Sequence, residues 1–274
     1  MAWHLTGDPD EFWSAAGEFL RSRPVEHSLP LTLTDTLRTR DLHHYGPEDP
    51  LFGWCESAGE VVGACLQTPP HPLLIVGDAS AELATTLAGR PLSAINTVAG
   101  DAFAGAWQQL TGTTASVTRQ TRLFRLGTFT PPSPPPPGRP RVAQAADREL
   151  LVGWLTAFHK ELGEHPGNPA RTVEDKLSYG GLTVWEVDGD PVSLAGATRP
   201  EDRVVRVAPV FTPAEQRGHG YAAGATAAVT QAALDAGAND VVLFTDVANP
   251  TSNALYQRLG YRPIEDRVVM EFSA

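Results

Sequence analysis

Cysteine, long apolar runs and basic residues are all scarce in this sequence of 274 residues. The two cysteines, Cys55 and Cys65, flank the turn of an expected hairpin, which favours small buried side chains in a reducing compartment over a disulfide framework or a metal site. No apolar run approaches the roughly 18 residues that a membrane-spanning helix needs, and the N-terminus MAWHLTGDPDEFW has neither the basic head nor the apolar core of a signal peptide. We therefore expect a cytoplasmic protein with no membrane segment and no metal.

The charge balance limits the partners that the chain is suited to bind. Lys and Arg total 21 and Asp and Glu total 32, which gives a formal net charge of -11. Nonspecific nucleic-acid binding requires clustered basic side chains that neutralise phosphates, so we expect no nucleic-acid partner. The balance favours a neutral or cationic small substrate, although acidic surfaces also serve solubility.

A proline-rich stretch divides the chain near its midpoint. The segment FTPPSPPPPGRPRV, residues 129–142, favours an extended polyproline conformation and has no capacity to form a core. With 42% hydrophobic residues overall, each half is long enough to bury a core of its own. We predict a first domain over residues 1–130, a linker over residues 131–141 and a second domain over residues 142–274.

The two halves repeat one order of local patterns. Each begins with an amphipathic helix after an aspartate, at Asp8 and at Asp147, passes through a second short helix and then enters a hairpin. The features present in both halves are Tyr45-Gly46 and Tyr179-Gly180, Trp54 and Trp185, the turns Gly59-Glu60 and Gly189-Asp190, and Gly63-Ala64 and Gly196-Ala197. This order predicts a tandem duplication, and chance similarity of two α/β patterns is the alternative.

The stretch RVVRVAPV, residues 203–210, is a β-branched run suited to a central strand of the second half. Pro209 has no N–H, so we expect a bulge or an end of strand pairing there. A strand that parts from its neighbour leaves backbone groups free. Those of Val210 and Thr212 would then bind an extended, peptide-like ligand.

A glycine-rich loop and a helix follow this strand, in the stretch QRGHGYAAG. Gly218 and Gly220 tolerate positive φ and allow close backbone approach, so the N–H groups from Gly218 to Ala222 are able to converge on an anion at a helix N-terminus. The pattern also matches the dinucleotide-binding G-x-G-x-x-A motif, but too few βα units follow it for that fold. We interpret the loop as a pyrophosphate site, with Arg217 either adding charge at its rim or lying solvated, and His219 as a loop residue.

The stretch DVANPTSNALYQRLG predicts a strand end and then a short helix. Asn249 is suited to cap this helix and Pro250 to its first position, while the helical period places Asn253 and Tyr256 on the same face as Asn249. A tyrosine on that face would be able to protonate a leaving thiolate, because a thiol has a pKa of about 8.5. Simple packing is the other interpretation of Tyr256.

The stretches VAPVFTPAEQRGHGYAAG and FTDVANPTSNALYQRLGYRPIED together resemble the GNAT N-acyltransferase superfamily, over about residues 141–274. Arg217, Gly220 and Ala222 meet its R/Q-x-x-G-x-G/A signature. The resemblance implies an α/β (α+β) fold of two tandem GNAT-like domains, each a mixed, mostly antiparallel sheet flanked by helices, with a splayed central strand pair in the second domain. It implies Tyr256 as the general acid and acetyl-CoA (coenzyme A) as the co-substrate. The residues that would bind this co-substrate are Val210, Phe211, Thr212, Arg217, Gly218, His219, Gly220, Tyr221, Ala222, Asn249 and Asn253.

The first half departs from this pattern. Its counterpart of the phosphate loop, VGDASAELATTLAG, has neither the paired glycines nor the arginine, and no Asn-to-Tyr helix follows LSAINTV. We therefore interpret residues 1–130 as a degenerate GNAT-like domain without a cofactor of its own.

The resemblance implies an acetyl-CoA-dependent N-acetyltransferase, in which a primary amine of a small molecule or peptide attacks the thioester directly in a ternary complex. An amine with a pKa of about 10.4 must first lose a proton. The strand over residues 203–210 has no carboxylate to accept it, which departs from a common family pattern; Glu161, Glu164 and His165 are candidates through water, and each is also typical of a solvated loop. A non-catalytic acyl-CoA sensor or assembly module is the alternative function. Neither the acceptor nor the oligomeric state follows from the sequence.

Overall fold

The computed structural model describes residues 1–273, which fall into two units. Unit 1 comprises Met1–Arg122, Asp246–Ala248 and residues 265–273, and unit 2 comprises Leu123–Thr245 and Asn249–Ile264. These units differ from the predicted domains. Residues 123–130 and the proline-rich residues 131–141 are part of unit 2, and residues 246–248 and 265–273 are part of unit 1. Residues 265–273 therefore belong to the same unit as the first half of the chain.

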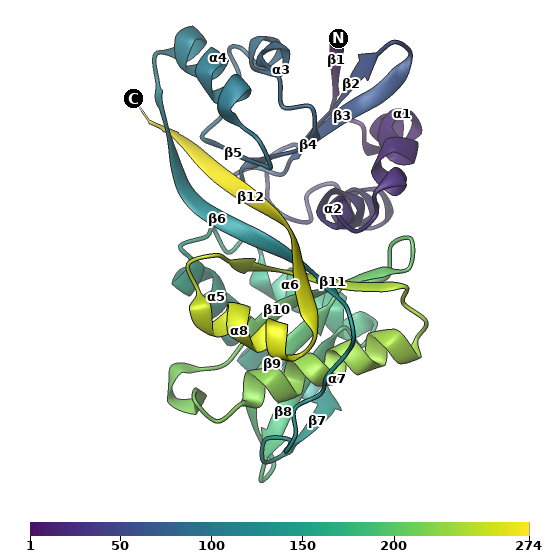
Figure 1. The fold of residues 1–274 in the computed structure, drawn as a ribbon, viewed down its shortest axis with the longest axis vertical. Helices are drawn as coiled ribbons and strands as arrows, with labels where there is room; N and C mark the ends of the chain where they lie inside the picture. Colours follow the sequence, from purple (N-terminus) through teal and green to yellow (C-terminus); the bar gives the residue numbers. More distant parts are fainter. Residues whose placement is uncertain (274) are drawn as a thin grey trace. The chain divides into compact units, whose positions relative to one another are not determined.

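The elements of the two halves follow the same order (Figure 1). The first half contains β1 (Ala2–Thr6), α1 (Pro9–Ser22), α2 (Ser28–Thr39), β2 (Leu51–Ser57), β3 (Glu60–Gln67), β4 (Leu73–Gly77), α3 (Ala81–Thr86), β5 (Ala94–Thr97), α4 (Asp101–Thr111) and β6 (Thr114–Leu126). The second half contains β7 (Arg139–Val142), α5 (Arg148–Leu162), α6 (Pro169–Ser178), β8 (Leu182–Val187), β9 (Asp190–Ala197), β10 (Val204–Phe211), α7 (Tyr221–Asp235), β11 (Asp240–Asp246), α8 (Pro250–Arg258) and β12 (Tyr261–Ser273).

The strand orders of the two units are also the same. Unit 1 has the order β1-β2-β3-β4-β5 and unit 2 the order β7-β8-β9-β10-β11, and β12 lies next to β5 whereas β6 lies next to β11. One pair in each unit is parallel, β4 with β5 and β10 with β11, and the other pairs along these orders are antiparallel. The predicted fold class, two tandem domains with mixed and mostly antiparallel sheets, is confirmed.

Both hairpins carry the same turn and the same irregularity. Ala58-Gly59 and Asp188-Gly189 close them with positive φ at both residues, which matches the right-handed twist of the strands. A register shift lies in the strand before each turn, between Cys55 and Glu56 in β2 and between Trp185 and Glu186 in β8. A bulge at the same place in both hairpins supports the duplication.

Two of the sequence correspondences between the halves are nevertheless wrong. Ser57 and Val187 each pair with the first residue of the following strand, so these two residues are equivalent in the two hairpins. Three residues before them stand Trp54 and Val184, so Trp54 corresponds to Val184 and not to Trp185. The two tryptophans accordingly pack on opposite faces, Trp54 with α1 and α2 and Trp185 with α7. A shift of one residue reverses the face of a strand, and Gly63-Ala64 and Gly196-Ala197 are likewise not equivalent.

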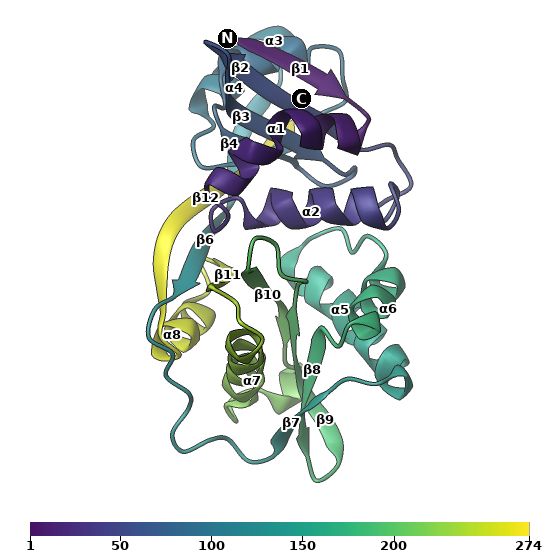
Figure 2. The same cartoon turned by 90° about the vertical axis from the view of Figure 1, so that its right-hand side faces the viewer.

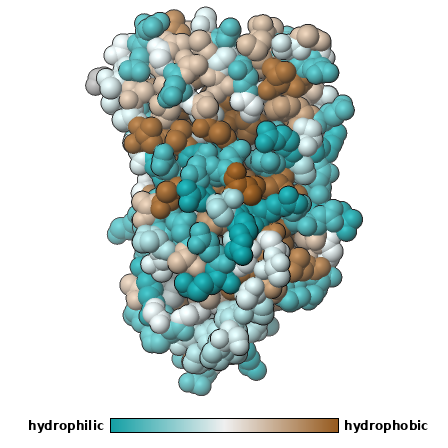
Figure 3. Space-filling view, viewed as in Figure 1, coloured by the Kyte–Doolittle hydropathy of each residue, from teal (hydrophilic) through white to brown (hydrophobic). Residues whose placement is uncertain are grey.

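Helices cover both faces of each sheet (Figure 2). In unit 1, α1 and α2 bury one apolar cluster and α3 and α4 another; in unit 2, α5 and α6 bury one cluster and α7 and α8 another. Each fully buried Leu or Phe in these clusters contributes about 1.5–3 kcal/mol. The space-filling view shows polar and apolar residues interspersed on the visible face (Figure 3).

Three helices begin with the same capping motif, a capping side chain followed by proline. Asp8, Asn168 and Asn249 each accept a backbone N–H from the first turn, and a proline occupies the next position. The predicted starts at Asp8 and Asn249 are confirmed. Asp147, in contrast, makes no capping bond to α5; its carboxylate accepts the N–H of Gln144 and a bidentate pair from Arg141. Within residues 1–273, no helix has both the length and the apolarity that crossing a bilayer demands.

Candidate functional site

The parallel pair at the centre of unit 2 separates part of the way along. Residues Val204–Arg206 of β10 pair with Asp240–Val242 of β11, and within the described residues the pairing does not extend beyond them. We call the parts of β10 and β11 that do not pair with each other, residues 207–211 and 243–246, the β10–β11 split. Its backbone groups face a neighbour strand that does not bond them, so an extended ligand is able to pair there.

A bulge in β10 accompanies the split. Val207 pairs with Ala197 of β9 and Val210 with Ala195, so Ala208 and Pro209 together oppose Gly196. The bulge predicted at Pro209 is confirmed. A Cβ on Gly196 would lie 2.6 Å from the carbonyl oxygen of Ala208, which explains why this position has no side chain.

The loop between β10 and α7 presents unbonded N–H groups at one end of the split. Gly218 and Gly220 have φ of +84° and +82°, as their predicted role requires. The first N–H of α7 with a backbone acceptor is that of Gly224, which bonds Gly220 O at 3.1 Å. In the chain from residue 1 to residue 273, no carbonyl accepts the N–H groups of residues 218–223. Consecutive unbonded N–H groups at a helix N-terminus attract an anion.

The side chain of Arg217 holds this loop instead of projecting into solvent. Its Nε donates to Thr212 O at 2.9 Å, and its terminal nitrogen donates to both carboxylate oxygens of Glu161 at 2.7 Å. The Thr212 hydroxyl lies 2.8 Å from Ser193 Oγ. The pair with Glu161 is half exposed, so its main effect is to position the loop against the end of α5.

The proline-rich segment forms a wall beside this loop. Trp185 Nε1 donates to Pro137 O at 2.7 Å, and Pro136 lies against the first turn of α7. A Cβ on Gly224 would come within 2.8 Å of both Pro136 and Trp185. This segment was predicted to be only a connector, and composition alone does not reveal that it packs.

The other residues of the loop are placed as follows. His219 is exposed, approaches Gln216 O at 3.3 Å through Nδ1, and stacks on Tyr221 with ring centroids 5.3 Å apart. Tyr221 is buried at the start of α7, and Phe211 is buried at the end of β10. His219 therefore has the loop position that its sequence indicates.

Asn249 and Asn253 lie together at the start of α8. Asn249 Oδ1 accepts the Ser252 N–H at 3.0 Å, and Asn253 Nδ2 donates to Asn249 O at 2.7 Å. The expected shared face is confirmed for these two residues. Their roles toward a ligand remain predictions.

Tyr256 occupies an apolar setting. It is 7% exposed, and its ring centroid lies 6.5 Å from that of Phe124 and 6.2 Å from that of Tyr261. Burial raises the pKa of its phenol, so the hydroxyl stays protonated at neutral pH. Tyr256 also packs in one cluster with Leu259.

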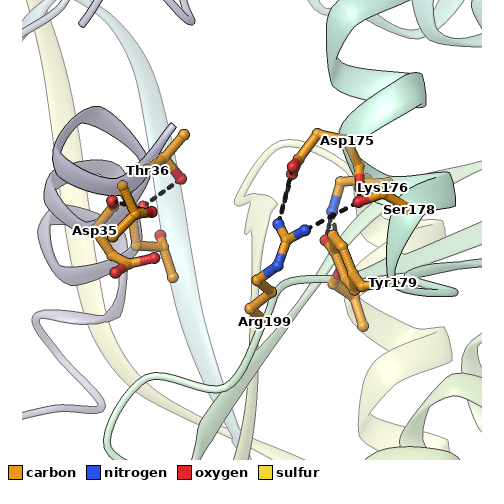
Figure 4. Close-up of polar contacts among 10 residues, drawn as sticks. Asp35, Thr36, Asp175, Lys176, Ser178, Tyr179 and Arg199 are labelled. Carbon is orange, nitrogen blue, oxygen red and sulfur yellow. Dashed lines mark hydrogen bonds and ion pairs between the residues drawn. The ribbon is translucent and has the colours of Figure 1, made fainter. Parts of the chain in front are cut away.

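The three residues considered as a base are engaged elsewhere. Glu161 pairs with Arg217, Glu164 lies 3.3 Å from His159 Nδ1, and His165 Nδ1 accepts the Gly167 N–H. Lys176, which no sequence pattern singles out, and Tyr179 bring their polar atoms together at Ala197 O (Figure 4). A single lysine on an amphipathic helix is typical of a solvated face, so only the contacts reveal this cluster.

The corresponding strand pair in unit 1 has a different environment. Its parallel pairing covers only Leu73 with Ile95 and Leu74 with Asn96. Beyond it, Arg267 of β12 donates to Ile75 O at 2.7 Å, to Asn96 O at 3.3 Å and to Asn96 Oδ1 at 3.0 Å. Arg267 is 3% exposed, and its guanidinium fills the place between β4 and β5 that corresponds to the β10–β11 split.

A comparison with family models finds a match in the second half of the chain. A model described as the acetyltransferase (GNAT) family matches residues 142–261, which includes β8 to α8. No curated protein matches the chain.

Solved structures resemble the whole chain. An acetyltransferase from the GNAT family of Colwellia psychrerythraea has a TM-score of 0.60 at 10% identity and covers 100% of both chains. A GCN5-related N-acetyltransferase from Sphaerobacter thermophilus has a TM-score of 0.64 at 14% identity, over 98% of this chain and 94% of the other. A tandem GNAT protein from the clavulanic acid biosynthesis pathway has a TM-score of 0.55 at 14% identity, over 99% and 98%. At these identities the likeness establishes the fold alone.

Proposed function

We propose, from the match of residues 142–261 to the GNAT acetyltransferase family model, that the protein transfers an acetyl group from acetyl-CoA to a primary amine of a small molecule or peptide. The observation that carries the proposal is the β10–β11 split together with the unbonded N–H groups of residues 218–223 at one end of it. A pyrophosphate fits these N–H groups, and the pantetheine arm fits the unpaired edge of β10.

The proposed roles follow the order of the chain. Val210, Phe211 and Thr212 bind the arm, and residues 217–222 bind the pyrophosphate. Asn249 and Asn253 border the arm from α8. The enzyme holds the amine and the thioester in line, so that proximity supplies a large part of the rate.

Tyr256 is the proposed proton donor to the departing thiolate. Its phenol is protonated at neutral pH, and within the described chain no hydrogen bond engages its hydroxyl, so the proton is available to the thiolate that forms beside it. We expect Tyr256→Phe to keep coenzyme A affinity and to lose turnover by about 10²–10⁴-fold. Unchanged turnover would remove Tyr256 from the mechanism.

Coenzyme A binding is tested at Gly218 against a matched control. Gly218 and Gly189 both have positive φ, and a Cβ at either meets nothing within 4 Å. Alanine at either position therefore costs about 1–2 kcal/mol in backbone strain. Only Gly218→Ala should weaken coenzyme A binding, measured by calorimetry and by the ligand-induced rise in Tm. Equal affinities for the two variants would refute the pyrophosphate site.

Turnover is tested by thiol release from acetyl-CoA with pooled amines, amino acids and peptides. Binding of acetyl-CoA without thiol release across the panel would favour an acyl-CoA-binding sensor or assembly module. We further propose that residues 1–130 bind no acyl-CoA, because Arg267 occupies the corresponding strand pair of unit 1. The cytoplasmic location rests on the composition alone.

A further inference from the structure

The apolar face of α5 loses its cover toward the end of the helix. This face consists of Leu151, Leu155, Phe158 and Leu162, whose spacing of three or four residues places them on one side of the helix. Leu151 and Leu155 are 0% and 2% exposed. Phe158 is partly exposed, and Leu162 is 36% exposed. The face that is buried in the first half of α5 is therefore open in the second half.

The packing along this face changes in the same way. Leu151 and Leu155 belong to the apolar cluster that α5 and α6 form with β8 and β9. Phe158 belongs to none of the four apolar clusters formed by residues 1–273. The aromatic ring that it meets edge-on is that of its neighbour His159, with centroids 5.4 Å apart. An inward-facing phenyl ring outside the core has apolar surface that another molecule is able to cover.

The residues on either side of Phe158 on the helix surface contact the outer end of the β10–β11 split. Trp154 lies one turn before it, with its ring centroid 6.2 Å from that of Phe211, the last residue of β10. Glu161 lies almost one turn after it and accepts from Arg217, the residue that precedes the glycine loop. Phe158 therefore lies between a contact to the end of β10 and a contact to the loop with the unbonded N–H groups.

A coenzyme A molecule bound as proposed passes this place. Its pyrophosphate binds the N–H groups of residues 218–223 and its pantetheine arm enters the split, so the first part of the arm lies at the end of β10. That part of the arm carries two methyl groups on one carbon and is its most apolar segment. Ligand sites are lined mainly by apolar and aromatic side chains, and the open face of α5 supplies such a lining at this point.

We propose that Phe158, with Leu162 at its rim, is a further acyl-CoA-binding residue that contacts the dimethyl segment of the pantetheine arm, an inference that rests on the proposed function. The arm then buries apolar surface that is exposed in the free protein, whereas backbone N–H groups bind the pyrophosphate. The two parts of the ligand therefore depend on different residues, and an experiment is able to separate them.

The test compares coenzyme A with 3′-phosphoadenosine 5′-diphosphate, which is coenzyme A without its arm, by titration calorimetry. Phe158→Ala should raise the Kd for coenzyme A by about 5–30-fold, because most of the apolar contact of one phenyl ring is lost. It should leave the Kd for the armless ligand unchanged. The heat-capacity change of coenzyme A binding should become less negative, because less apolar surface is buried. Phe158→Leu keeps an apolar side chain and should restore most of the affinity.

Two control variants come from the same helix. Leu150 is 39% exposed near the other end of α5, so Leu150→Ala should bind coenzyme A as the wild type does. Phe158→Ala should keep the Tm of the ligand-free protein, whereas Leu155→Ala removes a buried side chain and should lower it. A Tm for Phe158→Ala as low as that of Leu155→Ala would place Phe158 in the core and overturn the proposal.

The outcomes separate this proposal from the function on which it rests. If Phe158→Ala binds coenzyme A as tightly as the wild type does, the arm does not contact α5, and the proposed function stands. An equal loss of affinity for both ligands would show that Phe158 acts through the glycine loop, which also overturns the proposal. If the wild type binds neither ligand, the pyrophosphate site fails, and the role of Phe158 fails with it.

Discussion

Replacing Gly196 with alanine tests whether the bulge in β10 shapes the split. The added Cβ would lie 2.6 Å from Ala208 O and 2.9 Å from Pro209 Cδ, whereas ordinary contacts begin at 3.4 Å. One neighbour is a backbone carbonyl and the other a proline ring, so neither is able to rotate away. The bulge must then move by several tenths of an ångström, and we expect a cost of about 1–3 kcal/mol.

The assay is thermal unfolding combined with coenzyme A titration. In a chain of this size 1 kcal/mol corresponds to roughly 2–4 °C in Tm, so Gly196→Ala should lower Tm by about 2–12 °C and weaken coenzyme A binding as well. Gly105→Ala is the control, because its Cβ meets nothing within 4 Å in α4 and alanine favours a helix by about 0.5–1 kcal/mol. A Gly196→Ala protein with unchanged Tm and affinity would show that the bulge tolerates a side chain and does not set the split.

Four further changes have defined outcomes. Arg267→Met should lower the free energy of unfolding by about 2–6 kcal/mol, because two buried carbonyls lose their donors, and denaturant titration measures it. A fragment of residues 1–130 lacks the β12 residues that pair with β5, so it should show no cooperative unfolding by circular dichroism, whereas the full chain should. Asn249→Ala removes the cap of α8 and should cost about 0.5–2 kcal/mol in the same titration. Burial lowers the pKa of Lys176 to about 7, which makes the folded protein release a proton that the unfolded chain retains, so stability should rise between pH 7 and 9. Lys176→Met should reduce this rise, and an unchanged dependence of the free energy of unfolding on pH would contradict the lowered pKa.

Local chemistry made the centre of the second domain predictable. Gly218 and Gly220 have positive φ, Asn249 caps its helix and Pro209 marks a bulge, because each effect depends on one residue and its immediate neighbours. The order of elements was predictable for the same reason. Strand register was not: Trp54 and Trp185 look equivalent in sequence, but counting from the turns places them one residue apart on opposite faces.

Contacts between segments far apart in the chain could not be predicted from the sequence. Lys176 reads as a surface residue of an amphipathic helix, and only the approach of Ala197 and Tyr179 shows that it is held among polar partners. The place of β12 next to β5 joins residues about 170 positions apart, as in the pair Val268 and Thr97. No periodicity within either segment specifies such a partner.

The two units show why topology alone does not assign a function to this fold. Both have one parallel strand pair whose bonding stops after a few residues, so both have backbone groups that need a partner. In unit 1 the partner is part of the protein, since the guanidinium of Arg267 bonds Ile75 O and Asn96 O. In unit 2 the N–H groups of residues 218–223 have no acceptor in the described chain, and Gly218, His219 and Gly220 are exposed, so these groups are available to solvent or to a ligand. The duplicated fold therefore provides the same opening twice, and the residues that fill it, or leave it unfilled, distinguish the two copies and restrict the proposed acyl-CoA site to the second.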